Sequence, residues 1–173
     1  MNLTNTPAGL ELAVSSTPIS RAVGVLTCLA FVGSLVGCGL SVPSDPDGTL
    51  ATVTSGELRV GVSPDSGLVD VSSADPTGPL VDLVDEFTET IDANAEWTVG
   101  SEETLVGMLE AGDLDLLVGG FTDQSPWSDR AGITRGYTAI DGADGRSLVF
   151  LVPLGENAFL TKLETFLDEE VGP

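Results

Sequence analysis

Histidine is absent from this sequence of 173 residues, and lysine occurs only once. Without an imidazole, the chain holds no Ser-His-Asp or Cys-His catalytic set and no histidine-bearing zinc site. Asp113 and Asp115 share a strand face by their spacing, but no recognisable nucleophile or metal set accompanies them. Two acidic, glycine-containing segments, 45–48 and 141–145, lack the full calcium-loop pattern and predict turns instead. We therefore expect a protein that is not an enzyme and that holds neither a metal nor a cofactor.

Positive charge is equally scarce, since 6 basic residues stand against 27 acidic ones and the formal net charge is -21 at pH 7. A surface this negative repels phosphate backbones, so we expect no nucleic-acid partner. A salt-rich habitat or a high-GC genome would produce the same composition, and the charge alone therefore identifies no ligand. The hydrophobic fraction of 42% is high enough for a folded chain, and the length predicts one domain.

Cysteine occurs twice, in or just after the only long apolar run, residues 22–36. Arg21 precedes this run, whose length is typical of a signal-peptide core and short for a bilayer span. The run leads into Leu35-Val36-Gly37-Cys38, which resembles a bacterial lipobox. The resemblance implies cleavage before Cys38, acylation of this cysteine with chains such as palmitate, and anchoring in membrane lipid on the extracytoplasmic face of the bacterial cell. The alternative is an ordinary hydrophobic helix with chance cysteines.

The lipobox divides the chain into three parts. Residues 1–37 are predicted to be a signal peptide with an unusual N-terminal extension. Residues 38–55 contain Pro43, Pro46 and Gly48 with little periodicity, and they predict a lipidated, flexible tether. Folded structure is expected from residue 56 to residue 173.

Strand and helix patterns alternate in residues 56–173. Their short spacing predicts an α/β fold with three layers, in which a mostly parallel sheet of about four strands carries helices on both faces. Residues 121–145 show no regular pattern and predict a long loop, which in a compact domain is usually functional or disordered. The predicted strands are 57–62, 95–99, 114–118 and 146–152, and the predicted helices are 79–91, 101–111 and 157–167.

The order of these pieces resembles the extracellular solute-binding proteins of ABC transporters, of the type II periplasmic-binding-protein fold that binds polar amino acids. The resemblance is carried by the opening strand, by residues 105–115, by Gly119-Gly120-Phe121-Thr122-Asp123, and by residues 130–137. That family builds two lobes, and the residues for the second lobe are missing here. The resemblance therefore implies a single solute-binding-like lobe at residues 56–173.

In that family a threonine and an arginine of the stretch that corresponds to residues 119–137 hold the carboxylate of the ligand. Alternatives remain open for two of the corresponding residues, because Arg130 would also form a salt bridge to Asp123 or Asp129, and Trp127 would also pack over the sheet edge. The ligand-binding residues that the resemblance implies are Gly120, Thr122, Trp127 and Arg130.

Three functions remain open for this chain. The first is a lipid-anchored amino-acid-binding component that works with an ABC permease, or as a homodimer in which a second copy supplies the missing wall. A lone lobe leaves one side of a polar ligand in water, so we expect weak binding. The second is an interaction or scaffold lipoprotein that has kept the fold and lost the ligand, which predicts an exposed apolar patch. The third is a nonfunctional relic of a truncated gene.

Overall fold

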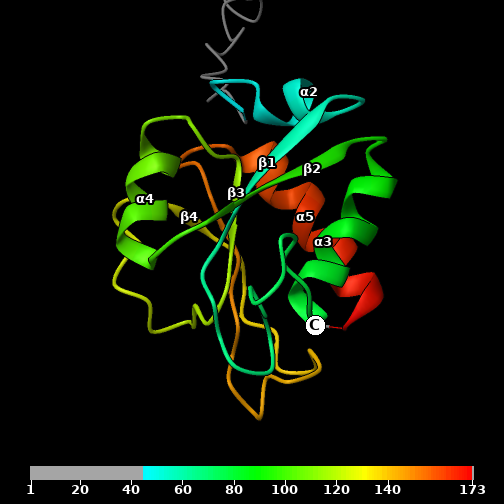
Figure 1. Cartoon of the computed structure of the whole chain (residues 1–173). Helices are drawn as coiled ribbons and strands as arrows, with labels where there is room; N and C mark the ends of the chain where they lie inside the picture. The colour runs from blue at the N-terminus through cyan, green and yellow to red at the C-terminus, as the bar shows by residue number, and fades with distance from the viewer. Residues whose placement is uncertain (1–44, 173) are drawn as a thin grey trace, which may run out of the picture. The chain divides into compact units, whose positions relative to one another are not determined.

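A five-stranded sheet runs through the part of the chain that the computed structural model describes, residues 45–172 (Figure 1). Its strands are ordered β2-β1-β3-β5-β4. The first three predicted strands and all three predicted helices are present, with ends that shift by a few residues. In chain order the elements are α2 (Thr49–Val53), β1 (Glu57–Val62), α3 (Pro79–Thr90), β2 (Asn94–Val99), α4 (Glu102–Glu110), β3 (Leu116–Val118), β4 (Gly132–Ile133), β5 (Leu151–Val152) and α5 (Asn157–Glu170).

The sheet is mixed, whereas the sequence predicts a mostly parallel one. Central strand β1 pairs in parallel with β2 on one side and with β3 on the other, as the alternation of strands and helices predicts. Strand β5 runs antiparallel to both of its neighbours, β3 and β4. The chain passes from β4 to β5 through a loop without a helix, and a parallel connection would need a longer crossover, usually a helical one. The α/β class is therefore confirmed, with a fifth strand, β4, inside the segment predicted to be a loop.

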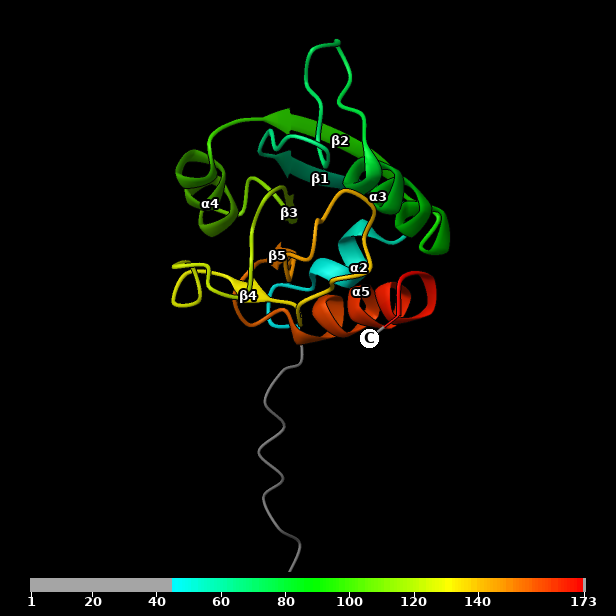
Figure 2. The same ribbon diagram turned by 90° about the horizontal axis from the view of Figure 1, so that it is seen from below.

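Helices cover both faces of the sheet, which gives the predicted three layers. Figure 2 shows α4 on one face and α3 and α5 on the other. The buried side chains divide in the same way, into a cluster between the sheet and α3 and α5 and a smaller cluster under α4. Alternate residues of β1 explain the division, since Leu58, Val60 and Val62 point into the first cluster while Gly61 faces Leu105 and Leu117 of the second.

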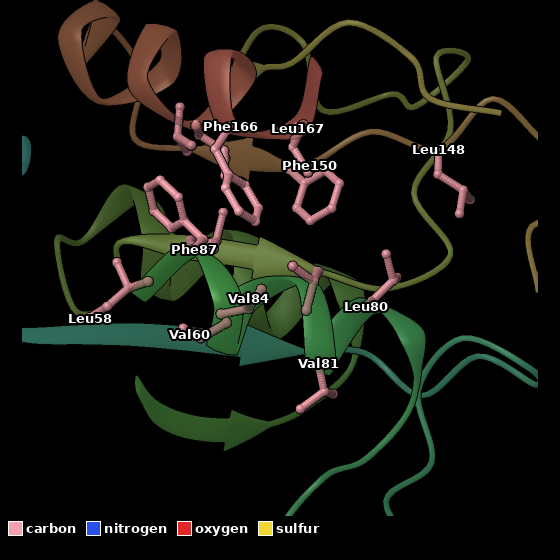
Figure 3. Close-up of a cluster of buried hydrophobic side chains, with 14 of the residues drawn as sticks. Leu58, Val60, Leu80, Val81, Val84, Phe87, Leu148, Phe150, Phe166 and Leu167 are labelled. Carbon is pink, nitrogen blue, oxygen red and sulfur yellow. The ribbon is translucent and has the colours of Figure 1, made fainter. Parts of the chain in front are cut away.

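Aromatic rings fill the larger cluster, between α3 and α5 (Figure 3). Phe87 of α3 is fully buried and meets two rings of α5, with centroids 6.0 Å from Phe159 and 5.5 Å from Phe166. Such tilted and edge-on pairs stabilise a core beyond the area that they bury. Leu80 and Val84 lie on the same face of α3, as their helical spacing predicts.

The segment before β1 is part of the domain, although the sequence predicts a flexible tether as far as residue 55. Helix α2 forms from residues 49–53, and its Val53 is completely buried in the larger cluster. Two carboxylates hold it: Asp45 accepts the Leu50 N–H at 2.8 Å, and Glu156 accepts the Thr49 N–H at 2.8 Å. Sequence alone does not indicate this helix because one of its caps is a residue more than a hundred positions away.

The described residues, 45–172, belong to one compact unit. Among the helices of the described residues, 45–172, none is long and apolar enough to span a bilayer. The predicted signal peptide and Cys38 lie outside the described residues.

Candidate functional site

The carboxyl ends of β1 and β3 meet at one edge of the sheet, which we call the carboxyl edge. The two strands are in register, with Val62 opposite Val118, and the Ser63 N–H donates to the Val118 carbonyl at 3.0 Å. Residues 63–67 follow β1, and Gly119 and Gly120 follow β3. Open α/β sheets bind ligands in the crevice outside the carboxyl ends of their strands. Figure 1 shows the loop after β1 and the loop before β5 together at the bottom of the domain, opposite α2.

An ion pair joins these two loops at the carboxyl edge. Both Nη atoms of Arg146 donate to the two carboxylate oxygens of Asp65, each at 2.9 Å. The Nε of the same guanidinium donates to the Ala143 carbonyl at 3.1 Å. The hydrogen bond to Asp65 raises the pKa of Arg146, so the guanidinium keeps its charge. Both side chains stay partly accessible, with 34% of Arg146 and 25% of Asp65 exposed.

Glycines bring the loops close enough for this pair to form. A Cβ on Gly120 would overlap the Asp65 carboxylate, so the absence of a side chain there gives the carboxylate its place. Gly142 has a φ of +80° and lies against the Gly67 carbonyl, where no other residue would fit without moving the backbone. Beside Asp65, residues 64–67 and 69–72 line an open pocket of about 500 Å³. Together, residues 63–67, Gly119–Gly120 and the Arg146 loop form a surface that we call the shelf.

The four residues that the sequence assigns to ligand binding do not come together at this shelf. Gly120 lies on the shelf. Thr122, two positions further along the chain, forms an antiparallel β-bridge with Leu148. Trp127 and Arg130 lie instead along α4, where the Trp127 Nε1–H is 3.5 Å from Glu102, and the Arg130 guanidinium stacks 5.3 Å from the Trp127 ring centroid. Trp127 thus packs against the cluster under α4, and Arg130 forms a salt bridge, although with a different partner from those predicted.

The salt-bridge partner of Arg130 is Glu110, and neither Asp123 nor Asp129 takes that place. Glu110 is the last residue of α4, a helix that starts beside the carboxyl end of β2 and leads to the start of β3. It therefore lies at the opposite, amino edge of the sheet. There Arg130 shares a pocket of about 280 Å³ with Asp47, Pro153 and Leu154. Hydrogen bonding to Arg130 lowers the pKa of Glu110 and raises that of Arg130, which keeps the pair ionised.

The amino edge also holds two buried carboxylates, Asp115 and Glu156, and each of them accepts at least one backbone N–H. Asp115 accepts the Arg59 backbone N–H at 3.0 Å and the Arg59 Nε–H at 2.9 Å, and this contact with Asp115 is the main reason that the pKa of Arg59 is raised. Glu156 accepts N–H groups of Asp47 at 2.9 Å and of Thr49 at 2.8 Å. These groups organise the amino edge and leave few donors or acceptors free for a ligand.

Asp45 and Glu156 form a carboxyl pair between the first turns of α2 and α5. Asp45 accepts the Leu50 N–H of α2 and, at 3.3 Å, the Phe159 N–H of α5. Burial raises the pKa of Asp45, and the neighbouring Glu156 raises it further, against the opposing hydrogen bonds. Burial also acts to raise the pKa of Glu156, but the N–H groups that it accepts outweigh burial and lower it. The two carboxyls thus divide their roles, with Glu156 as the ionised acceptor.

Within residues 45–172, no group of three or more acidic or cysteine side chains is placed to hold a metal ion. The segment 141–145, which carries calcium-like spacing, is a turn, and three of its residues, Gly142, Asp144 and Gly145, have positive φ angles.

Solved structures of arginine-binding proteins share this architecture. The arginine-bound form of domain 1 of TmArgBP matches with a TM-score of 0.57 and 20% identity, over 65% of this chain and 92% of that one. A periplasmic binding protein of Salmonella typhimurium with high arginine specificity matches with a TM-score of 0.56 and 12% identity, over 68% of this chain and 94% of that one. An ancestral arginine-binding protein bound to arginine gives a TM-score of 0.54 and 11% identity, over 65% and 91% of the two chains.

The chain has the fold of one periplasmic-binding-protein lobe. All three matched structures are described as binding proteins, and one of them is a single domain. No protein-family model matches the sequence, and no curated protein matches it.

The sequence does not indicate two residues of the shelf, Asp65 and Arg146. Arg146 is assigned to a predicted strand, but the strand begins only at Leu151. Asp65 is assigned to a closing loop of β1, without a partner. The two residues are 81 positions apart, and no spacing rule connects them. The sequence signal that could have identified Arg146 is the scarcity of cations. An arginine in a glycine-rich turn of a strongly acidic chain is expected to form an ion pair with a carboxylate.

Proposed function

We propose that this protein is an extracytoplasmic binding protein for a polar amino acid and that the shelf at the carboxyl edge is its binding surface. The observation that carries the proposal is the meeting of Asp65, Arg146 and Gly119–Gly120 at the edge where α/β sheets bind ligands. The likeness to an arginine-bound domain of similar extent supports the same role. The chain matches 92% of that domain, so the comparison involves one lobe on each side.

The chemistry of the shelf suits an α-amino acid. Asp65 supplies a carboxylate that would bind an ammonium or guanidinium group of the ligand. The backbone of the Gly119–Gly120 turn lies close to Asp65, and its amides would bind the carboxylate of the ligand. The ligand would touch one wall, since the described domain has no second lobe. Charge-assisted hydrogen bonds weaken in contact with water, so the affinity of the free protein is expected to be low. Thr122 borders the shelf, and Trp127 and Arg130 contact α4 through Glu102 and Glu110, so we place the ligand on Asp65 and Gly120.

Lipid attachment through Cys38 fits this arrangement and is part of the proposal. Residue 45 lies at the amino edge, since it caps α2 and α5, and the shelf lies at the carboxyl edge. Asp45 lies seven positions after Cys38, which limits the reach of the chain between them to about 25 Å. An anchored domain would thus keep its amino edge near the membrane and present the shelf outward, to an ABC permease partner or to a second copy of the chain.

The scaffold alternative predicts an exposed apolar patch. Among the described residues, the exposed large hydrophobic side chains are Val99 and Leu154, at 50% and 59% exposure. Val99 ends β2 and Leu154 follows β5, two strands separated by β1 and β3, so they form no common patch. The surface therefore favours the binding function.

The test is binding of L-amino acids to the purified full chain, kept in detergent. Isothermal titration and thermal melting would be run with arginine, lysine, glutamate, glutamine and leucine. Saturable binding of a polar member, lost in Asp65→Asn and kept in Arg130→Ala, is the expected result. Absence of binding to every amino acid, by this protein and by the variant Arg146→Ala described below, would refute the proposed function.

A further inference from the structure

We propose that Arg146 is a tethered ligand, a guanidinium of the chain itself that occupies the shelf in the free protein and that an external guanidinium compound displaces. This inference rests on the proposed function in that it concerns the same surface, and it adds the chemical class of the ligand and the way in which the surface is regulated. The free protein would then be self-occupied, and binding would be an exchange of one guanidinium for another.

The contacts of Arg146 are those of a bound guanidinium. Its two Nη atoms meet both oxygens of Asp65 at 2.9 Å in the parallel, two-pronged geometry that carboxylates and guanidinium groups prefer. The remaining donors are directed at carbonyls of the adjacent turn, with Nε 3.1 Å from Ala143 O and Nη2 3.4 Å from Gly142 O. One carboxylate and two carbonyls thus surround one planar cation, and these three acceptors remain in place when the side chain leaves.

The attachment of Asp65 differs from that of Asp115 and Glu156, the two buried carboxylates of the amino edge. Among residues 45–172, the side chain of Arg146 is the single hydrogen-bond donor to the Asp65 carboxylate. Asp115 and Glu156 accept backbone N–H groups, so displacing their partners would unfold local structure. Rotation of the Arg146 side chain frees Asp65 with no change in the backbone. The shelf is therefore an exchangeable site, whereas the amino edge is not.

The loop that carries Arg146 stays in place without the ion pair. Its base is closed by two backbone hydrogen bonds, from Tyr137 N–H to Leu148 O at 2.8 Å and from Leu148 N–H to Tyr137 O at 2.9 Å. Within it Ile140 and Ala143 are buried. The carbonyls that face the guanidinium thus belong to a fixed turn. A side chain on such a turn competes at an effective concentration on the millimolar scale or above.

Other acidic residues on the shelf favour a cation at the position of the Arg146 guanidinium. Asp70 lines the same pocket as Asp65, and Asp144 adjoins Arg146 and raises the pKa of Arg146 together with Asp65. Among residues 45–172, Arg146 is the cation whose ion pair lies at this edge, since Arg59 and Arg130 are paired at the amino edge and Arg135 is paired with α5. Removing Arg146 leaves an acidic surface that attracts a replacement cation.

The experiment compares the full chain in detergent with Arg146→Ala and with Arg146→Ala/Asp65→Asn. Methylguanidinium is the probe, and binding is followed by NMR chemical shifts of backbone amides at positions 65–67, 120 and 142–144. We expect Arg146→Ala to bind methylguanidinium about fivefold more tightly than the unaltered protein, the size of a partly exposed ion pair. The double variant should lose that gain. Arg135→Ala, which breaks an exposed ion pair on α5, is the matched control and should leave binding at these amides unchanged.

A second measurement uses the unaltered protein, so that the test does not depend on the folding of a variant. The Nε–H resonance of Arg146 should move toward the position of a free arginine side chain as methylguanidinium is added. Equal binding by the unaltered protein and Arg146→Ala, or a gain that survives Asp65→Asn, would overturn the tethered-ligand proposal. These outcomes are separate from a failure of the proposed function, because methylguanidinium tests the shelf and the amino-acid panel tests the physiological ligand. If Arg146→Ala binds methylguanidinium and no amino acid, the proposed function fails and the tethered ligand stands.

Discussion

Replacing Glu156 by alanine tests whether α2 belongs to the folded domain. The carboxylate of Glu156 is 1% exposed and accepts two backbone N–H groups, those of Asp47 and Thr49. Thr49 is buried, so its N–H would lose its partner without gaining water, at a cost of about 2 kcal/mol. Asp47 is exposed, and its N–H would bond to solvent after a loss of about 1 kcal/mol. We therefore expect Glu156→Ala to lower the free energy of unfolding by about 3 kcal/mol.

Thermal melting followed by circular dichroism would measure this loss. For a domain of this size, 1 kcal/mol shifts the midpoint by about 3 °C, so Glu156→Ala should melt about 9 °C lower. Glu156→Gln keeps one acceptor oxygen, and about half of that shift is expected. Glu169→Ala is the matched control, because Glu169 lies exposed on the same helix, α5, and should change the midpoint by about 1 °C. A midpoint for Glu156→Ala within about 2 °C of the unaltered protein would refute the structural role of this cap.

Three other predictions concern separate parts of the domain. The pKa of Asp45 is raised in the folded protein above its usual value of 3.8. Its carboxyl therefore stabilises the fold below pH 3.8 and loses that contribution as pH rises through the folded-state pKa. The stability of Asp45→Asn relative to the unaltered protein should thus increase as pH rises. Melting midpoints between about pH 3 and pH 7 check this, and a difference that stays constant with pH would contradict it. Asp115→Asn should cost about 2 kcal/mol in urea unfolding, since Arg59 is partly solvated, and an unchanged urea midpoint would show that the pair adds no stability. Gly142→Ala should cost about 1 to 2 kcal/mol, because φ is +80° and a Cβ would overlap the facing loop, and a melting midpoint equal to that of the unaltered protein would show that the two loops are not in contact.

The helices and central strands follow from local patterns that the sequence carries in full. Helix α3 is predicted at 79–91 and observed at Pro79–Thr90, because Pro79 starts the first turn and apolar residues then recur on one face. Helix α4 begins after Ser101, whose hydroxyl accepts the Thr104 N–H, as the predicted cap requires. Each of these signals lies within a single turn or a few turns of chain, so no tertiary information is needed.

Elements that depend on distant partners are the ones that the sequence does not reveal. Strand β4 is two residues long, Gly132–Ile133, and it exists because β5 lies beside it. Helix α2 is five residues long, too short to be stable alone, and it is capped by carboxylates of which one comes from the start of α5. Strand β5 runs antiparallel because no crossover helix lies between β4 and β5. The apolar pattern of residues 146–152 predicts a strand but says nothing about its direction.

The candidate site follows the same division. Gly120, which the resemblance implies as a ligand-binding residue, follows the buried strand β3 and lies against Asp65, and its contact with a ligand stays a prediction. The sequence places Arg130 beside Gly120 because the two are near in the chain, whereas the connection from β3 carries Arg130 along α4 to the other edge of the sheet. The residue that does reach the shelf, Arg146, comes from the far end of the loop.

The two edges of the sheet satisfy their carboxylates in different ways, and this difference indicates which edge is free to bind. At the amino edge Glu156 and Asp115 accept backbone N–H groups, so release of either carboxylate would break α2 or the start of β1. At the carboxyl edge Asp65 holds a side chain that is 34% exposed, and the glycines around it hold the loop without that contact. At the shelf, a ligand has to displace only the side chain of Arg146. At the amino edge, it would have to break hydrogen bonds to the backbone. Because a rotamer change costs far less than a lost helix cap, exchange belongs to the carboxyl edge, and the amino edge serves as the support.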